Sequence, residues 1–117
     1  MERKKHTTLR EIFTYICDIY LTKGEKEVQL DNGWCVYSSQ KILTLDSECY
    51  IEDYPDYDDD NEVFDEYITL NDMNLKYRDE IVQDVVIACL TQKRDATYDE
   101  IMKALDYYEK FDDFMIL

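Results

Sequence analysis

Three aspartates in the middle of the chain, Asp56, Asp58 and Asp60, have the spacing of the first three ligands in an EF-hand calcium loop. That register also requires Gly at position 6, for a sharp turn, and a bidentate Glu at position 12. The chain has Asn61 and Tyr67 there, which excludes an ordinary EF-hand. An irregular weak cation site and a solvated loop that attracts cations loosely both remain open. The solvated loop is the better interpretation, so we predict no metal site.

Side chains suited to catalysis are scarce. The single histidine, His6, lies among Lys and Thr near the N-terminus, where no Ser or Cys nucleophile has an evident base. A chain with two glycines has no glycine-rich phosphate loop. Paired carboxylates are abundant, but 28 acidic residues produce many pairs by chance. We therefore expect no enzyme activity and no cofactor.

The cysteines do not have the spacing of a metal site. They lie far apart, without a C-x-x-C pair and without a neighbouring histidine, at positions Cys17, Cys35, Cys49 and Cys89. Structural zinc needs clustered ligands. Free Cys is among the most frequently buried residue types. We expect free, mostly buried thiols and a reducing compartment.

Acidic residues are concentrated in one segment. The chain has 28 Asp and Glu against 13 Lys and Arg, a formal net charge of −15. Residues 42–75 contain 12 acids and no Lys or Arg, so this segment alone contributes −12. Such charge opposes compaction by self-repulsion. It favours fast, electrostatically steered association with a cationic partner.

Tyrosines are interleaved with these acids at positions 50, 54, 57 and 67. Tyr provides a large rigid contact area with one polar group, is enriched at interface hot spots, and can stack on guanidinium groups. The alternative is that the charge run is a solvated face that only aids solubility. We predict that a basic protein binds this segment, through Glu52, Asp53, Tyr54, Asp56, Tyr57, Asp58, Asp59, Asp60 and Glu62.

The same charge argues against two other partners. A net charge of −15 repels the phosphate backbone of nucleic acids, whose neutralisation by Lys and Arg dominates such affinity. No stretch approaches the roughly 20 apolar residues of a membrane span. The basic N-terminal cluster is followed by Arg10, Glu11 and Asp18, which interrupt any signal-peptide core. We expect no direct nucleic-acid binding, no membrane association and a cytoplasmic location.

Helix signals lie at both ends of the chain. Thr8 and Glu11 form a T-x-x-E capping box before apolar residues at helical spacing, and Gly24 is a natural stop. The pattern predicts a helix over about 8–23. Similar periodicity predicts a second helix over 77–94. Thr97 and Glu100 repeat the capping box and begin a third helix, after which we expect the final apolar residues to dock on the core.

The segments between these helices have strand signals. Val28 and Leu30 alternate with polar residues, and Asn32-Gly33 can form the tight turn of a β-hairpin over 27–37. Extended segments over 42–45 and 49–51 complete a small antiparallel meander of three to four strands. We predict one α+β domain over residues 1–117, comprising an N-terminal helix, this meander, an acidic loop over 52–63 and two C-terminal helices. Residues 1–7 are expected to be a mobile tail.

Short motifs in both halves of the chain carry a resemblance. They are TLREI at 8–12, LTLD at 43–46, QDVV at 83–86, DAT at 95–97, and the segment 106–114, which contains the Tyr107-Tyr108 pair. In these motifs the chain resembles small acidic bacterial immunity-type proteins associated with contact-dependent inhibition and polymorphic toxin systems. The resemblance implies an α+β fold and neutralisation of a toxin domain, commonly a nuclease with a basic cleft. The acidic loop is longer and richer in Tyr than the family pattern.

Charge and resemblance lead to one hypothesis and two alternatives. The hypothesis is an immunity protein that neutralises a cognate basic toxin domain by occupying its substrate cleft or by binding beside it. The first alternative is a nucleic-acid mimic that inhibits a defence nuclease, of the anti-restriction or anti-CRISPR type. Its charge should be spread at duplex-like spacing over one face, whereas here it is packed into one segment. The second alternative is a structural or adaptor domain.

Overall fold

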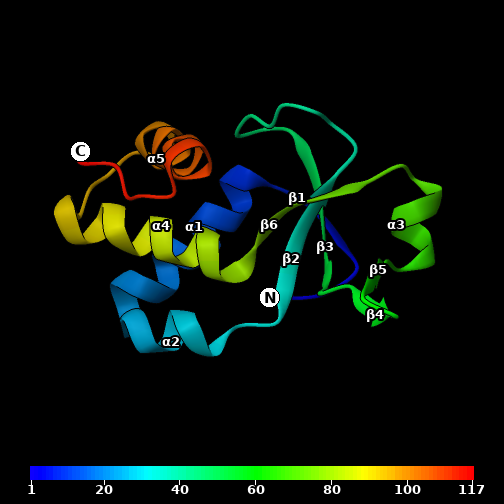
Figure 1. Ribbon diagram of the computed structural model, residues 1–117. Helices are drawn as coiled ribbons and strands as arrows, with labels where there is room; N and C mark the ends of the chain where they lie inside the picture. The colour runs from blue at the N-terminus through cyan, green and yellow to red at the C-terminus, as the bar shows by residue number, and fades with distance from the viewer.

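A four-stranded antiparallel sheet separates a layer of helices from a smaller second layer (Figure 1). The computed structural model describes residues 1–117. The elements, in chain order, are β1 (Lys5–Thr8), α1 (Leu9–Lys23), α2 (Glu25–Leu30), β2 (Trp34–Ser38), β3 (Glu48–Asp53), β4 (Asp56–Asp58), β5 (Asn61–Val63), α3 (Glu66–Leu70), β6 (Asn74–Arg78), α4 (Asp79–Gln92) and α5 (Tyr98–Phe111). The sheet order is β1-β3-β2-β6, and β4 and β5 form a separate hairpin. The predicted α+β class is confirmed.

Strand β2 is central, and both of its faces are buried. Trp34 and Val36 face the helices and join the main core, which also includes residues of α1, α4 and α5. Cys35 and Tyr37 face the other way and pack with Tyr50 and with residues of α3. The sheet is therefore covered on both sides, and the second, smaller layer lies beside the acidic segment.

Both predicted helix caps are present. Thr8 accepts a hydrogen bond from the Glu11 N–H at 3.2 Å, while the Glu11 carboxylate accepts from Thr7 rather than closing the box. At α5 the box is complete, because Thr97 and Glu100 each accept from the other's backbone N–H, at 3.1 and 2.9 Å. These bonds satisfy backbone donors that have no intrahelical partner. They explain why the starts of α1 and α5 were predictable.

The predicted hairpin over 27–37 is wrong, because residues 25–30 form α2. Val28 is buried while Leu30 is 70% exposed, so the apparent alternation reflects a single buried position. The buried amide of Gln83, on α4, donates to the carbonyls of Val28 and Asp31 at 2.9 and 2.7 Å. A contact from more than 50 residues away therefore satisfies the end of α2.

Two other boundaries differ from expectation. Residues 42–45 are not a strand. They lead into a turn in which Thr44 N–H donates to the Ser47 hydroxyl at 2.8 Å, whereas the predicted segment 49–51 lies within β3. The second helix begins at Asp79 rather than at 77, because Tyr77 and Arg78 belong to β6 and pair with β2. Strand β6 was not predicted, since its partner lies some 40 residues earlier in the chain.

The N-terminus is ordered rather than a mobile tail. Strand β1 pairs antiparallel with β3, in a register that places His6 opposite Tyr50. The terminal ammonium of Met1 pairs with Asp31, and Lys4 N–H donates to Ile51 O at 2.7 Å. These contacts attach residues 1–7 to the sheet. At the other end Met115 packs against the core, as expected, although Ile116 remains exposed.

All four cysteines are free and buried, as expected. Burial raises the pKa of the Cys17, Cys49 and Cys89 thiols to about 11 and that of Cys35 to about 12. None of the helices is both long and apolar enough to cross a bilayer.

Replacing Gly24 with Ala should lower the free energy of unfolding by about 1–3 kcal/mol. Gly24 ends α1 with φ 96° and ψ 177°, a conformation that residues with a Cβ rarely adopt. A Cβ there would meet no atom within 4 Å, so the effect is backbone strain alone. Urea unfolding monitored by circular dichroism measures it, with Lys23→Ala as the neighbouring control. Equal stability of Gly24→Ala and the wild type would contradict the assigned conformation.

The native protein should react with iodoacetamide at pH 8 far more slowly than the urea-unfolded chain. The attacking species is the thiolate, which the raised pKa and burial of all four cysteines suppress. Timed alkylation followed by mass spectrometry measures this difference, with reduced glutathione as an internal standard. A cysteine alkylated at its unfolded rate in the native protein would show that its site is open.

Candidate functional site

The acidic segment forms a projecting hairpin, here called the acidic arm (residues 56–63). Asp56 pairs with Val63, Tyr57 with Glu62 and Asp58 with Asn61. Asp59 and Asp60 occupy the turn with φ of 49° and 67°, the left-handed values that a two-residue hairpin turn requires. The predicted irregular loop over 52–63 is therefore wrong: residues 48–53 belong to β3 and residues 56–63 form the hairpin. Asp tolerates positive φ better than most residues, and this permits the turn without glycine.

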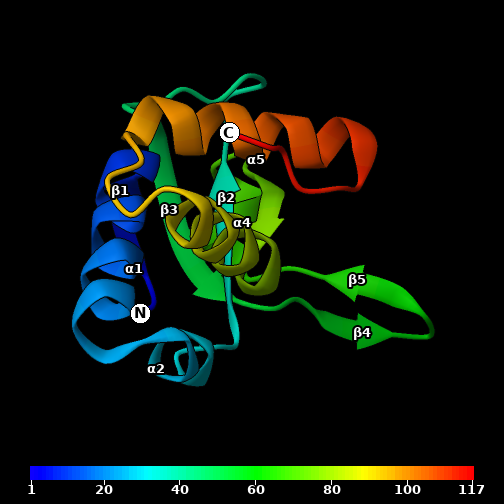
Figure 2. The same cartoon turned by 90° about the vertical axis from the view of Figure 1, so that its left-hand side faces the viewer.

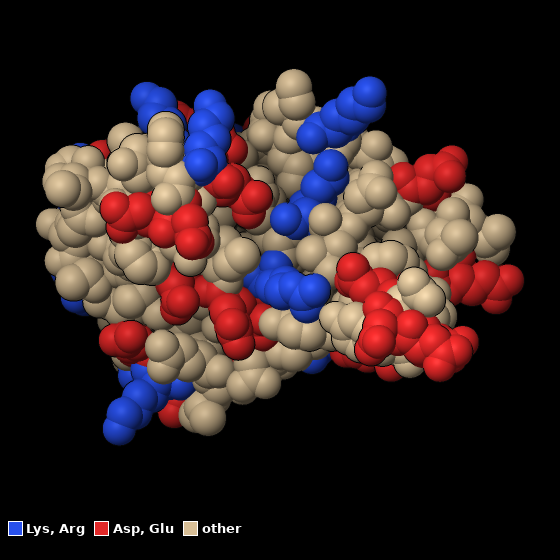
Figure 3. Space-filling view, viewed as in Figure 1, with Lys and Arg blue, Asp and Glu red and all other residues tan.

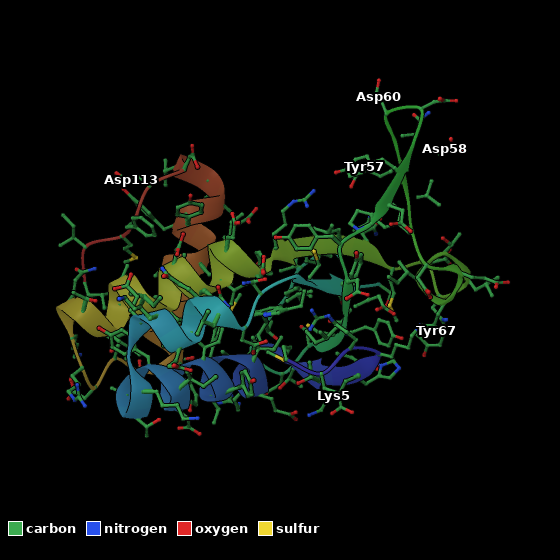
Figure 4. The ribbon with its side chains drawn as sticks, turned by 90° about the horizontal axis from the view of Figure 1, so that it is seen from below. Lys5, Tyr57, Asp58, Asp60, Tyr67 and Asp113 are labelled. Atoms are coloured by element: carbon green, nitrogen blue, oxygen red, sulfur yellow. The ribbon has the colours of Figure 1, made fainter.

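The arm extends away from the body of the molecule (Figure 2). All six residues of β4 and β5 are exposed. Tyr57 and Asp58 point to opposite sides of the arm, and Asp60 lies at its tip (Figure 4). Tyr57 is 64% exposed, the most of any tyrosine in the chain. The arm thus presents carboxylates and one aromatic ring to solvent.

Tyr54 attaches the base of the arm to the helical layer. Its hydroxyl donates to the buried carboxylate of Asp79, which also accepts from Gly33 N–H at 2.6 Å and Glu80 N–H at 2.8 Å. Burial, followed by the bond to Asp79, raises the pKa of the Tyr54 hydroxyl well above its ordinary value. The guanidinium of Arg78 lies over the Tyr54 ring, 5.0 Å from its centroid. Tyr54 is therefore largely a structural residue.

Glu52 and Asp53, at the end of β3, are paired with cations from the N-terminus. Arg3 Nε donates to Oδ1 of Asp53 at 2.6 Å. Lys4 Nζ lies 3.2 Å from Oε2 of Glu52 and 3.6 Å from Oδ2 of Asp65. Glu52 is only 5% exposed, whereas Asp53 reaches solvent. At the root of β5, Glu62 has a looser partner, Arg78, at 3.9 Å.

The nine predicted site residues consequently fall into two groups. Glu52, Asp53, Tyr54 and Glu62 contact cations or buried groups of the protein itself. The second group has no ion pair or side-chain hydrogen bond within the chain and lies together on the arm: Asp56, Tyr57, Asp58, Asp59 and Asp60. A band of acidic side chains covers the arm and α3 region in the space-filling view (Figure 3).

Sequence reasoning missed the groups that neutralise the base of the arm. Arg3 and Lys4 lie about 50 residues before their partners, and Arg78 lies 16 residues after Glu62. Each pair depends on strand pairing, of β1 with β3 and of β6 with β2. A basic cluster beside an acidic segment was the only signal available, and it does not specify which residues pair. No group of three or more His, Cys, Asp or Glu side chains is placed to share one metal ion.

The comparisons with known proteins concern most of the chain. Residues 8–117 match a family described as a domain of unknown function (DUF7716). The chain belongs to this family. The DUF7716 match contains the sheet from the end of β1 onwards, the acidic arm and every helix, but it leaves out Arg3 and Lys4. No curated protein and no solved structure matches the chain.

Replacing Tyr54 with Phe should lower the free energy of unfolding by about 1.5–3 kcal/mol, the usual contribution of a hydrogen bond to a charged group. The change leaves the buried Asp79 carboxylate with one donor fewer. Tyr57→Phe is the matched control, because no hydrogen bond to the Tyr57 hydroxyl is formed within the chain and its loss should change stability by less than about 0.5 kcal/mol. Urea denaturation of both variants measures the difference. Equal stabilities would show that Tyr54 does not anchor the arm.

Proposed function

We propose that this protein is an immunity protein that binds and neutralises a basic toxin domain of the nuclease class, with the acidic arm as its main contact. The observation that carries the proposal is the unpaired charge of the arm. Asp56, Asp58, Asp59 and Asp60 project from the body without a cation of the chain beside them. The resemblance to immunity-type proteins in the motifs at both ends of the chain gives independent support.

The composition of the arm argues against solubility as its sole role. Two three-residue strands without an apolar face are only marginally stable in water. Five like charges in eight residues weaken the hairpin further. A solubilising surface would be served equally well by acids spread over the body. Concentrated, projecting charge is better suited to a concave cationic partner.

The target chemistry follows from what nucleases must bind. Clefts that hold nucleic acid are lined by Lys and Arg, which neutralise the phosphates. Three residues of a β-strand span about 10 Å, so the arm is long enough to reach into such a cleft. Carboxylates at its tip would take the positions of phosphates, and the exposed ring of Tyr57 could stack on a guanidinium. Binding that covers the cleft from its rim would inhibit equally well.

The first test is capture of partners by the full-length protein from a lysate of its source organism, at low salt and at about 0.5 M salt. The higher concentration shortens the Debye length to roughly 4–5 Å. We expect one basic toxin domain, held tightly and weakened by salt. Purified toxin then permits affinity and nuclease inhibition to be measured directly. Capture of a defence nuclease instead would contradict the proposal in favour of a nucleic-acid mimic.

Neutralising the tip of the arm should weaken toxin binding about tenfold or more and reduce its salt dependence. The variant carries Asp58→Asn, Asp59→Asn and Asp60→Asn, and Asn tolerates the positive φ at positions 59 and 60. A matched control removes three exposed charges elsewhere on the surface, through Glu2→Gln, Glu27→Gln and Asp99→Asn. Calorimetric titration compares the two variants. The same affinity for both would show that net charge, and not the arm, determines binding.

A further inference from the structure

A small pocket lies beneath the base of the acidic arm, on the face of the sheet away from the large helices. Its volume is about 240 Å³, below the range of ordinary small-molecule sites and suited to a single side chain. Its charged lining consists of Lys4, Glu52, Asp53, Asp56 and Asp65. Four carboxylates and one ammonium leave three negative charges in excess (4 − 1 = 3), or two after the external Arg3 is counted against Asp53.

The pocket contains a buried carboxylate oxygen without an adequate partner. Glu52 is 5% exposed, and its Oε1 accepts from the Asp53 N–H at 2.9 Å. Oε2 is buried and accepts no hydrogen bond. Lys4 Nζ approaches it to 3.2 Å, but at an angle that does not form one. A buried carboxylate left in this way is costly, because desolvation of a charged group is large and needs full compensation.

Lys4 is a poor occupant of this pocket. Its distances of 3.2 Å to Glu52 and 3.6 Å to Asp65 exceed the 2.7–2.9 Å of good charge-assisted hydrogen bonds. Its side chain is 67% exposed, so it enters from outside and can leave without disturbing the core. The backbone N–H of Lys4 is bonded separately, to Ile51 O. The attraction of Glu52, followed by that of Asp65, raises the pKa of Lys4, so the residue is a cation at neutral pH.

The remaining walls are suited to a planar cation. Tyr37, Tyr54 and Phe64 line the pocket, and the rings of Tyr37 and Phe64 meet edge to face at 6.2 Å. Asp65 uses Oδ1 to cap α3, through a bond from the Tyr67 N–H at 3.0 Å, and its Oδ2 remains directed at the lysine. A guanidinium has five donors in a rigid plane and stacks on aromatic rings, which an ammonium cannot match.

We propose that this pocket is an arginine-binding subsite, in which an arginine side chain of the basic partner displaces Lys4 and binds Glu52 and Asp65. The proposal depends on the proposed function for the identity of the partner. It deepens that function by adding a specific anchor beneath an arm that acts mainly through long-range charge. Lys4 then serves as an internal occupant that keeps the buried carboxylate paired in the free protein.

The test uses the isolated full-length protein and a small probe. Nα-acetyl-arginine amide is titrated into ¹⁵N-labelled protein, and amide shifts are followed by nuclear magnetic resonance. We expect saturable shifts confined to residues 52–56 and 63–65. Nα-acetyl-citrulline amide, the neutral isostere, should bind at least tenfold more weakly. Nα-acetyl-lysine amide should bind several-fold more weakly than the arginine probe.

Variants distinguish the pocket from general acidity. Lys4→Gln removes the internal competitor and should strengthen probe binding about fivefold. Glu52→Gln should weaken it at least tenfold. Asp65→Asn keeps a good N-cap residue and should weaken it several-fold, so it serves if Glu52→Gln folds poorly. Asp72→Asn, at an exposed acid outside the pocket, should have no effect.

Equal shifts with the citrulline probe, absence of saturation, or unchanged binding by Asp65→Asn would overturn the subsite. None of these results depends on a toxin, so they would leave the arm-based immunity proposal standing. If the probe binds as expected while no basic toxin is captured, the subsite survives and the proposed function fails.

Discussion

The buried carboxylate of Asp79 joins the parts of this fold that would otherwise be independent. It is the first residue of α4, directly after β6, and it is 1% exposed. Its three donors come from the segment before β2, from its own helix and from Tyr54 at the base of the acidic arm. A buried charge without a cation is tolerated only when its lone pairs are satisfied. Here that requirement fixes the start of α4, the approach to the central strand and the position of the arm together.

The arrangement of cations explains how so acidic a segment stays folded. Arg10 pairs with Asp46 through two hydrogen bonds, of 2.8 and 3.0 Å, and holds the pKa of that carboxyl below its usual value. Arg3 and Lys4 neutralise the end of β3, and Arg78 lies against the root of β5. These pairs all lie where the segment meets the body. Charge is therefore balanced where it would oppose folding and left unbalanced on the arm, where solvent screens it.

The parts of the fold that could be predicted from sequence are those determined by neighbouring residues. Thr97 and Glu100 form a complete capping box within four positions, and Gly24 ends α1 through its own positive φ. The free, buried cysteines followed from composition and spacing. Strand β1, strand β6 and helix α2 were missed because distant partners stabilise each of them. In α2 the decisive contact is the amide of Gln83, and no local pattern indicates it.

The candidate site shows the same division. Composition identified the acidic segment, and its most exposed members, from Asp56 to Asp60, are the residues that remain available for a partner. Composition could not separate them from Glu52 and Tyr54, which differ only in what the fold places beside them. That difference has a functional consequence. Tip residues such as Asp58 contact nothing else in the chain, so changing them alters partner recognition at little cost in stability. The pocket around Glu52 lies in the sheet and is constrained by its packing. An adaptable tip beside a rigid anchor would let one fold meet partners that differ in shape while retaining a shared requirement for an arginine.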